Sequence, residues 1–372
     1  MVDLLKRIKK YFREDRVLEN IFKSNYSKNV LISYTVSPFL SNKNRHTNVQ
    51  ESKILAKIFN ELGFNVDVIH YTNQKKIDYK KYGLIFGFGE PFENSFTDTK
   101  LKRIYYATGA HVCHQNYAEI KRVEEVNKKY NINLLPKRLV PWNWSMSTSL
   151  SDSLILIGNE WTKSTYTKYT TKPVYTINAT ALINDNVQNI KRDLDKTKKN
   201  FLWFGSSGLV HKGLDLCLEY FSKQEDLTLH ICGPMEDDFN EAFTEYFEKE
   251  NIIYHGFTDV QSKKFIDIVS QCSFSILPTC SEGQATSLLT AMGAGLIPIA
   301  TENSGVDIVK HGILIQELNL ESLTSSIEKA SKHENEKLSK ISNEIEEHIS
   351  KNHILDKFRL SMKNILNSIL ND

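Results

Sequence analysis

The chain has 372 residues, enough for two domains of ordinary size. Hydrophobic residues make up 40% and charged residues 25%, with only 16 glycines and 8 prolines, which excludes a disordered, a collagen-like or a disulfide-rich miniature protein. The five cysteines are scattered without a C-x-x-C pair, which favours a reducing compartment. No apolar run approaches the roughly 18 residues of a membrane-spanning helix.

The net charge of +2 conceals an uneven distribution along the chain. Residues 1–186 hold 28 Lys and Arg against 17 Asp and Glu, a balance of +11, whereas residues 187–372 hold 19 against 28, a balance of −9. A basic first half favours contact with an anionic surface or acceptor. No nucleic-acid-binding module accompanies this charge, so we expect no nucleic-acid partner.

Residues 1–28 are predicted to form a basic amphipathic helix, with eight Lys or Arg against four acidic residues. Its apolar stripe consists of Leu4, Leu5, Ile8, Tyr11 and Phe12. Such a helix either lies on an anionic membrane surface or packs on the first domain with its lysines in solvent. No apolar signal-peptide core follows, so we expect a cytoplasmic protein, with a peripheral position on the inner face of the plasma membrane left open.

The first half alternates strands with helices. The expected strands are Asn29–Thr35, Val66–His70, Tyr82–Phe86, Arg103–Ala107, Leu154–Gly158 and Pro173–Ile177. This alternation predicts a parallel sheet, and ligands of such sheets bind beyond the carboxyl ends of the strands. Residues 29–186 are therefore expected to form a Rossmann-like domain on the acceptor side.

Residues 187–200 form a polar, lysine-rich linker, after which the alternation restarts. Residues 201–350 are predicted to form the second doubly wound domain, which faces the first across a cleft. Residues 351–372 have the pattern of a helix that packs back on the first domain. The predicted fold class is thus α/β, with two Rossmann-like doubly wound parallel-sheet domains.

The most informative stretch follows the first strand of the second domain. The strand Phe201–Phe204 runs into Gly205-Ser206-Ser207-Gly208, and Lys212-Gly213 opens a helix. Small residues let backbone N–H groups approach an anion, and a helix N-terminus and a lysine add positive charge. The stretch contains neither a G-K-[ST] phosphate loop nor G-x-G-x-x-G, which argues against ATPase and dehydrogenase functions.

A second stretch, Ile276–Thr301, contains another strand, a loop and a helix. Glu282 lies in the loop, where its carboxylate can accept hydrogen bonds from sugar hydroxyls. The amides of the next residues point toward a diphosphate; these residues are Gln284, Ala285 and Thr286. Glu282 has a second interpretation, as an acid placed favourably near a helix N-terminus.

Together, the two stretches resemble the nucleotide-sugar-binding domain of GT-B glycosyltransferases, specifically the retaining group 1 family, over about residues 200–310. The matching features are Gly205, Lys212-Gly213, Pro278, Glu282-Gly283 and the run Ala291-Met292-Gly293-Ala294-Gly295-Leu296-Ile297-Pro298-Ile299. The resemblance implies a GT-B fold and a nucleotide-diphosphate sugar as the donor substrate. It implies no cofactor and no required metal. The donor-binding residues that it implies are Gly205, Ser206, Ser207, Gly208, Lys212, Gln284, Ala285, Thr286 and Thr290.

Two departures from the family pattern mark a divergent member. The position of the family's second glutamate, which contacts the donor ribose, holds Thr290, whose hydroxyl makes a weaker hydrogen bond than a carboxylate. The arginine that commonly joins the lysine at the diphosphate is absent, since Ser206 and Ser207 occupy that region.

In the first half, His111 ends a strand at the predicted cleft, and the resemblance assigns it to the donor sugar, with His114 as the close competitor. A metal cluster of these two histidines with Cys113 lacks a fourth ligand. The D-x-D motif Asp193–Asp195 lies in the linker, which argues against a metal-dependent GT-A enzyme.

Two residues are weaker candidates for the acceptor side. Glu90 follows a strand and a glycine turn, where it would face the acceptor, act as a base if the reaction inverts the sugar, or simply be solvated. His46, beside the first strand, has the same ambiguity.

We therefore expect a hexosyltransferase-like enzyme that is retaining and metal-independent, with His111 and Glu282 as its catalytic residues. The acceptor is expected to be a carbohydrate or a lipid-linked molecule, in surface polysaccharide or glycoconjugate biosynthesis. The alternatives are a non-catalytic nucleotide-sugar-binding subunit, which the two departures favour, and a sugar-nucleotide epimerase of the same fold.

Overall fold

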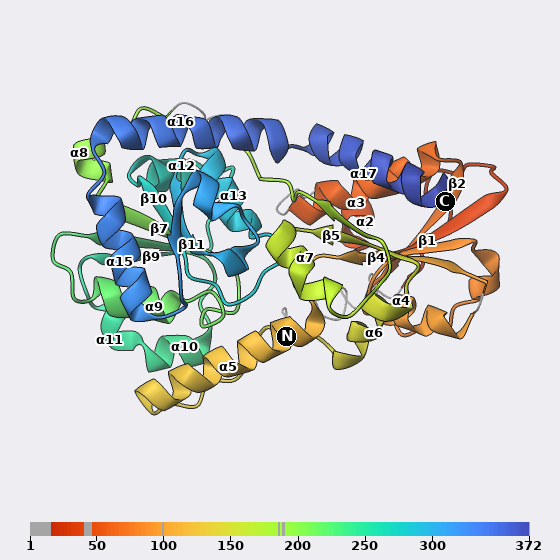
Figure 1. The fold of residues 1–372 in the computed structure, drawn as a ribbon, viewed down its shortest axis with the longest axis horizontal. Coiled ribbons are helices and arrows are strands. Elements are labelled where there is room, and N and C mark those ends of the chain that lie inside the picture. Colours follow the sequence, from red (N-terminus) through yellow and green to blue (C-terminus); the bar gives the residue numbers. More distant parts are fainter. Residues whose placement is uncertain (1–15, 41–46, 99, 185–186, 188–189, 372) are drawn as a thin grey trace.

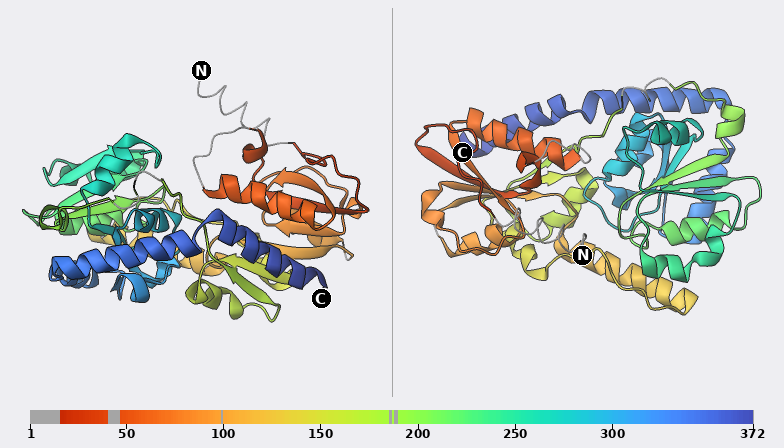
Figure 2. Two further views of the ribbon diagram at one scale, coloured as in Figure 1. Left: turned by 90° about the horizontal axis from the view of Figure 1, so that it is seen from above. Right: turned by 180° about the vertical axis from the view of Figure 1, so that it is seen from behind.

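The computed structural model describes residues 16–40, 47–98, 100–184, 187 and 190–371. Two six-stranded sheets form two domains that lie side by side (Figure 1). The C-terminal helices α16 (Asn335–Asn352) and α17 (Leu355–Asn371) cross from the second domain to the first. On the opposite side of the molecule, helix α5 (Val112–Tyr130) extends from the first domain along the second (Figures 1 and 2).

All strands of the first sheet are parallel, in the order β2-β1-β3-β4-β5-β6. The strands are β1 (Lys28–Tyr34), β2 (Phe64–His70), β3 (Leu84–Gly87), β4 (Lys102–Ala107), β5 (Ser153–Ile157) and β6 (Val174–Ile177). The helices around them are α2 (Ser37–Leu40), α3 (Thr47–Glu61), α4 (Glu90–Asn94), α5 (Val112–Tyr130), α6 (Met146–Leu150) and α7 (Glu160–Thr167). Every residue of β3 and β5 is buried, as expected for a parallel sheet with both faces covered.

The second sheet is also parallel, in the order β12-β11-β10-β7-β8-β9. Its strands are β7 (Asn200–Phe204), β8 (Thr228–Cys232), β9 (Ile252–Gly256), β10 (Phe274–Leu277), β11 (Ile297–Thr301) and β12 (Ile313–Ile315). The helices are α9 (Leu214–Phe221), α10 (Asp237–Ala242), α11 (Thr244–Phe247), α12 (Lys263–Ser270), α13 (Thr286–Gly293), α14 (Ile308–His311) and α15 (Leu320–Ser331), and the short α8 (Leu194–Thr197) precedes β7.

In both sheets the first strand of the domain lies in the interior, so that the order of strands reverses beside it. β1 lies between β2 and β3, and β7 lies between β8 and β10. Such reversal points are where doubly wound sheets bind ligands, beyond the carboxyl ends of the strands. The glycine turn after β7 is therefore in the expected position for a ligand.

The C-terminal helices join the two domains. α16 (Asn335–Asn352) packs on α13 of the second domain, and α17 (Leu355–Asn371) packs on α3 of the first. Arg359 Nη2 and Lys363 Nζ of α17 lie 2.7 and 2.9 Å from the carboxylate of Glu61. The predicted fold class, with two doubly wound domains and a C-terminal helix that returns to the first, is confirmed.

The N-terminal segment differs from the helix predicted over residues 1–28. Residues 1–15, which contain the apolar stripe, lie outside the described residues. Residues 16–28 are not helical: Leu18 pairs with Val68 in an antiparallel bridge, and Ile21 N donates to Val66 O at 3.0 Å. The prediction is wrong for this segment because β2 is an edge strand, whose free backbone groups bind an extended chain.

Among the described helices, none is both long enough and apolar enough to cross a lipid bilayer.

Candidate active site

The glycine turn after β7 is shaped by the conformations that its glycines adopt. Gly208 has φ +86°, and Gly213, which precedes α9, has φ +66°. Both values lie in the left-handed region, where a side chain is strained. A Cβ on Gly213 would also lie 2.2 Å from the carbonyl oxygen of Pro278. The turn and the start of α9 therefore lie close to the end of β10, where the second stretch of sequence begins.

Lys212 and Glu282 form an ion pair at this position. The Lys212 ammonium donates to Glu282 Oε1, and the two side chains are only 6% and 11% exposed. Burial would raise the pKa of Glu282, but Lys212, Arg138 and His211 outweigh it and lower this pKa to about 2. The carboxylate is therefore ionised at neutral pH and can accept hydrogen bonds from hydroxyl groups.

Arg138 is a component of the site that the sequence interpretation missed. It lies on the loop after α5, in the first half of the chain, and its Nη2 is 3.9 Å from Glu282 Oε2. Its aliphatic stem covers Gly208, where a Cβ would lie 2.5 Å from Arg138 Cγ. A guanidinium thus lies beside the glycine turn, although the turn itself contains no arginine.

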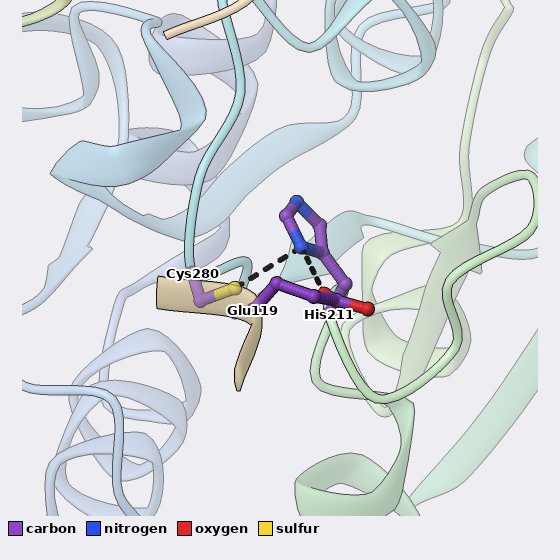
Figure 3. A group of neighbouring side chains, drawn as sticks. All are labelled: Glu119, His211 and Cys280. Atoms are coloured by element: carbon purple, nitrogen blue, oxygen red, sulfur yellow. Dashed lines mark hydrogen bonds and ion pairs between the residues drawn. The ribbon is translucent and has the colours of Figure 1, made fainter. Parts of the chain in front are cut away.

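Three buried side chains, Glu119, His211 and Cys280, form a group next to Lys212 and Glu282 in the two loops (Figure 3). His211 Nδ1 lies 2.7 Å from Glu119 Oε2 and 3.2 Å from Cys280 Sγ, and its other nitrogen contacts the carbonyl oxygen of Ser281. Among the described residues this is the one group of carboxylate, imidazole and thiol atoms close enough to share a metal ion. Burial raises the pKa of the Cys280 thiol, which therefore stays protonated beside His211. We interpret the group as a hydrogen-bonded bridge.

Glu119 connects the two loops that carry the cationic groups. Its Oε1 accepts the backbone N–H groups of Lys137 and Arg138, at 2.7 and 3.0 Å, while its Oε2 faces His211. Burial opposes ionisation, but the hydrogen bonds from His211 and from the two amides lower the pKa of Glu119. One carboxylate on α5 therefore fixes both the Arg138 loop and the loop that presents Lys212.

The turn after β4 contacts the loop of Glu282. A Cβ on Gly283 would lie 2.6 Å from the carbonyl oxygen of Thr108, so only glycine allows this approach. Thr162 of α7 holds the same loop through a hydrogen bond from its Oγ1 to Gly283 O, at 2.6 Å. The carboxyl ends of strands from both sheets therefore meet at this point.

His111 caps the first turn of α5 and is 1% exposed. Its Nδ1 accepts the N–H of Cys113 at 3.2 Å, which leaves the proton on Nε2, and among the described residues this atom has no hydrogen-bond partner. Its ring stacks on Tyr169 at 4.0 Å between centroids. Burial, with smaller effects of His114 and Lys168, lowers the pKa of His111 to about 4. His111 is therefore neutral at pH 7 and has a free N–H donor.

The remaining candidates of the first half are His114, Glu90 and His46. His114 packs edge-on against Trp161. Burial lowers the pKa of His114, and the positive charge of Lys168 lowers it further. Glu90 begins α4, and its carboxylate accepts the indole N–H of Trp144 at 3.1 Å. His46 lies outside the described residues.

Three of the predicted donor-binding residues after Glu282 form hydrogen bonds with backbone groups of other segments. Gln284 bridges the domains, accepting from Ala179 N at 2.7 Å and donating to Gly305 O at 3.1 Å. Ala285 N donates to Ser304 O at 2.9 Å, and Thr290 Oγ1 accepts from Leu182 N at 3.1 Å.

The other predicted donor-binding residues lie at the glycine turn and at the start of α13. Ser206 and Ser207 are exposed, and Gly208 donates its amide N–H to the carboxylate of Glu236. Gly205 is buried between Trp203 and Gly233, and Thr286 is the first residue of α13. Lys212 and Glu282 are thus in direct contact, whereas the two serines lie exposed in the turn before them.

Comparisons with known proteins find a family model that matches the second half of the chain. Residues 186–348 match the family model of the glycosyl transferases group 1. A comparison with curated protein sequences finds no match. Sucrose-phosphate synthase from Thermosynechococcus elongatus superposes with a TM-score of 0.63 and 12% identity, over 92% of this chain and 98% of that chain.

Two further solved structures share the fold. HepE from Anabaena, in complex with UDP and glucose, has a TM-score of 0.58 and 11% identity over 92% of this chain and 99% of that chain. WaaG, a glycosyltransferase involved in lipopolysaccharide biosynthesis, has a TM-score of 0.57 and 13% identity over 90% and 98%. Residues 186–348 are therefore similar to the glycosyl transferases group 1 family, and the chain as a whole has the two-domain GT-B fold that these solved structures share.

Proposed function

We propose that the enzyme transfers a hexosyl group from a nucleoside-diphosphate sugar to a carbohydrate or lipid-linked acceptor. The observation that carries the proposal is the ion pair of Lys212 and Glu282, which joins the two family stretches at the glycine turn. A cation for a diphosphate and an ionised carboxylate for sugar hydroxyls thus lie side by side. HepE, solved with UDP and glucose, has a similar fold, which supports this class of donor.

In this proposal the second domain binds the donor. The diphosphate lies at the glycine turn near the N-terminus of α9, where Lys212 and the helix dipole stabilise the charge that develops on the leaving group. Glu282 accepts hydrogen bonds from the hydroxyls of the transferred sugar. Its low pKa keeps it ionised and therefore acceptor-only.

The first domain contributes His111 and the acceptor surface. The free Nε2–H of the neutral His111 ring is a donor for a sugar oxygen. Closure of the two domains around the donor excludes water and favours transfer over hydrolysis. Contact of residues 1–28 with an anionic membrane, which would bring the enzyme to a lipid-linked acceptor, is a further part of the proposal.

We also propose that the reaction retains the configuration of the anomeric carbon and needs no metal ion. Retention is the outcome that the resemblance to the group 1 family implies. Metal independence rests on Lys212, whose ammonium can neutralise diphosphate charge. Proton NMR of the first product formed would distinguish retention from inversion, and the rate should not change when EDTA is added.

A two-step experiment tests the function. The purified chain is first screened for thermal stabilisation by UDP-, GDP- and ADP-sugars, because a ligand that binds only the folded state raises the melting temperature. The stabilising donor is then incubated with and without oligosaccharide and lipid-linked acceptors, and the nucleoside diphosphate and the product are quantified. Binding without turnover would favour a non-catalytic subunit, and a new nucleotide sugar formed without acceptor would favour an epimerase.

A further inference from the structure

We propose that Arg138 is the second cationic group of the diphosphate site, supplied by the first domain to a glycine turn that has no arginine of its own. The inference rests on the proposed function, because it concerns how the same site binds its donor. It assigns a binding role to a residue outside residues 186–348, the part of the chain that matches the family model.

The position of Arg138 carries the argument. Its stem lies over Gly208, with Cγ 2.5 Å from where a Cβ of that glycine would be, and its Nη2 reaches to 3.9 Å from Glu282 Oε2. Lys212 holds the other oxygen of the same carboxylate. The Arg138 guanidinium and the Lys212 ammonium therefore lie at different oxygens of the Glu282 carboxylate, next to the glycine turn.

The backbone of Arg138 is held firmly, whereas its side chain is held loosely. Its N–H donates to Glu119 Oε1 at 3.0 Å and its carbonyl accepts from Gln115 Nε2 at 3.0 Å. The side chain, in contrast, is 35% exposed, and 3.9 Å is long for an ion pair. A fixed backbone with a partly exposed guanidinium is well suited to receive an incoming anion.

The turn already binds an oxyanion of the protein. The amide N–H of Gly208 donates to the carboxylate of Glu236, beside the stem of Arg138. A backbone donor of the turn therefore accommodates a negatively charged oxygen at this position. A phosphate oxygen also needs a hydrogen-bond donor for its negative charge, so it can replace the Glu236 carboxylate at the Gly208 amide.

The charges also favour this role. Lys212 and Arg138 bring two positive charges to the turn, and Glu282 and Glu236 bring two negative ones. Once a phosphate oxygen replaces Glu236 at the Gly208 amide, the remaining set has one cation in excess. A diphosphate carries more negative charge than one lysine neutralises. Guanidinium donates two parallel hydrogen bonds to phosphate oxygens, which an ammonium cannot do.

The test compares Arg138→Gln and Arg138→Lys with a matched control, Lys137→Ala. The Gln variant keeps a stem over Gly208 and removes the charge. Lys137 is the adjacent residue, and its Nζ lies 2.7 Å from Asp238, so the control also loses an ion pair between the two domains. Calorimetry measures Kd for the diphosphate that binds wild type best among UDP, GDP and ADP, and for the corresponding monophosphate.

We expect Arg138→Gln to raise the diphosphate Kd at least tenfold and the monophosphate Kd by less than threefold. Arg138→Lys should recover part of the loss, and Lys137→Ala should match wild type for both ligands. An unchanged diphosphate Kd in Arg138→Gln would overturn the assignment, as would an equal loss for both ligands, which indicates separation of the domains. If wild type binds none of the three diphosphates, the proposed function fails and this assignment fails with it.

Discussion

Glu119 of the first domain and His211 of the second are in direct contact, with Oε2 and Nδ1 2.7 Å apart in a fully buried position (Figure 3). They join α5 to the loop that carries Lys212. Because the other oxygen of Glu119 holds the backbone of Lys137 and Arg138, one carboxylate sets the distance between the loops of both cations. The relative position of the two domains is thereby coupled to the geometry of the site.

Glu119→Gln should lower the free energy of unfolding by about 2 kcal/mol, because charge-assisted hydrogen bonds to His211 and to two amides become neutral ones. Urea denaturation followed by circular dichroism measures this change. Glu124→Gln on the same helix is the control, since Glu124 is exposed and pairs with Lys128 of the same helix, and it should leave the midpoint unchanged. Equal midpoints for Glu119→Gln and wild type would show that the bridge adds no stability.

Removing one partner of the Lys212–Glu282 pair should destabilise the folded protein. Lys212→Met should lower the free energy of unfolding by about 3 kcal/mol, because it leaves a buried carboxylate without its main partner. The double variant Lys212→Met, Glu282→Gln should lose less than the sum of the two single variants, because the groups interact directly. Additive losses in a double-mutant cycle would contradict the pair as described.

The pH dependence of stability should reveal the ionised Glu282. Its folded pKa of about 2 lies below the 4.5 that is usual for a glutamate, so its contribution to stability is fully present above about pH 5 and is lost as the pH falls toward 2. The contribution is on the order of 3 kcal/mol. The stability difference between wild type and Glu282→Gln should therefore be constant above pH 5 and shrink below it. A difference that does not change between pH 5 and pH 3 would contradict the lowered pKa.

His111 has two roles that substitutions can separate. His111→Asn keeps an N-cap for α5, whereas His111→Ala removes it and should cost about 1 kcal/mol of stability. Both variants lack the free Nε2–H, so both should lower kcat/KM at least tenfold. Thermal denaturation and initial rates measure the two effects. Wild-type rates in His111→Asn would show that the cap is the only role of this residue.

Most of the fold follows from local sequence patterns. The alternation of strands and helices predicts both sheets except β12, the short edge strand of the second. The glycine turn, Lys212 and Glu282 are recognisable because each belongs to a continuous stretch of sequence with a characteristic pattern. The meeting of the His111 turn with the Glu282 loop is also expected, since carboxyl ends of parallel strands face the cleft. Arg138 and Glu119 could not be predicted, because their roles depend on α5 lying along the second domain, which no local pattern encodes.

The charge difference between the two halves has a partial structural explanation. Basic side chains of α5 and the loop after it pair with acidic side chains of the second domain. The pairs are Arg122–Asp215, Lys129–Glu219, Lys137–Asp238 and Arg138–Glu282. The Arg122–Asp215 pair is almost completely buried. Part of the basic excess of the first half therefore binds the second half of the same chain.

The central claim is that Lys212 and Glu282 form the donor site of a glycosyltransferase. The most direct measurement is the acceptor-dependent release of nucleoside diphosphate from the donor that stabilises wild type, compared among wild type, Glu282→Ala and Lys212→Ala, each verified as folded. We predict release with transfer to the acceptor in wild type and a loss of at least a hundredfold in both variants. Undiminished transfer in the two folded variants would contradict the assignment.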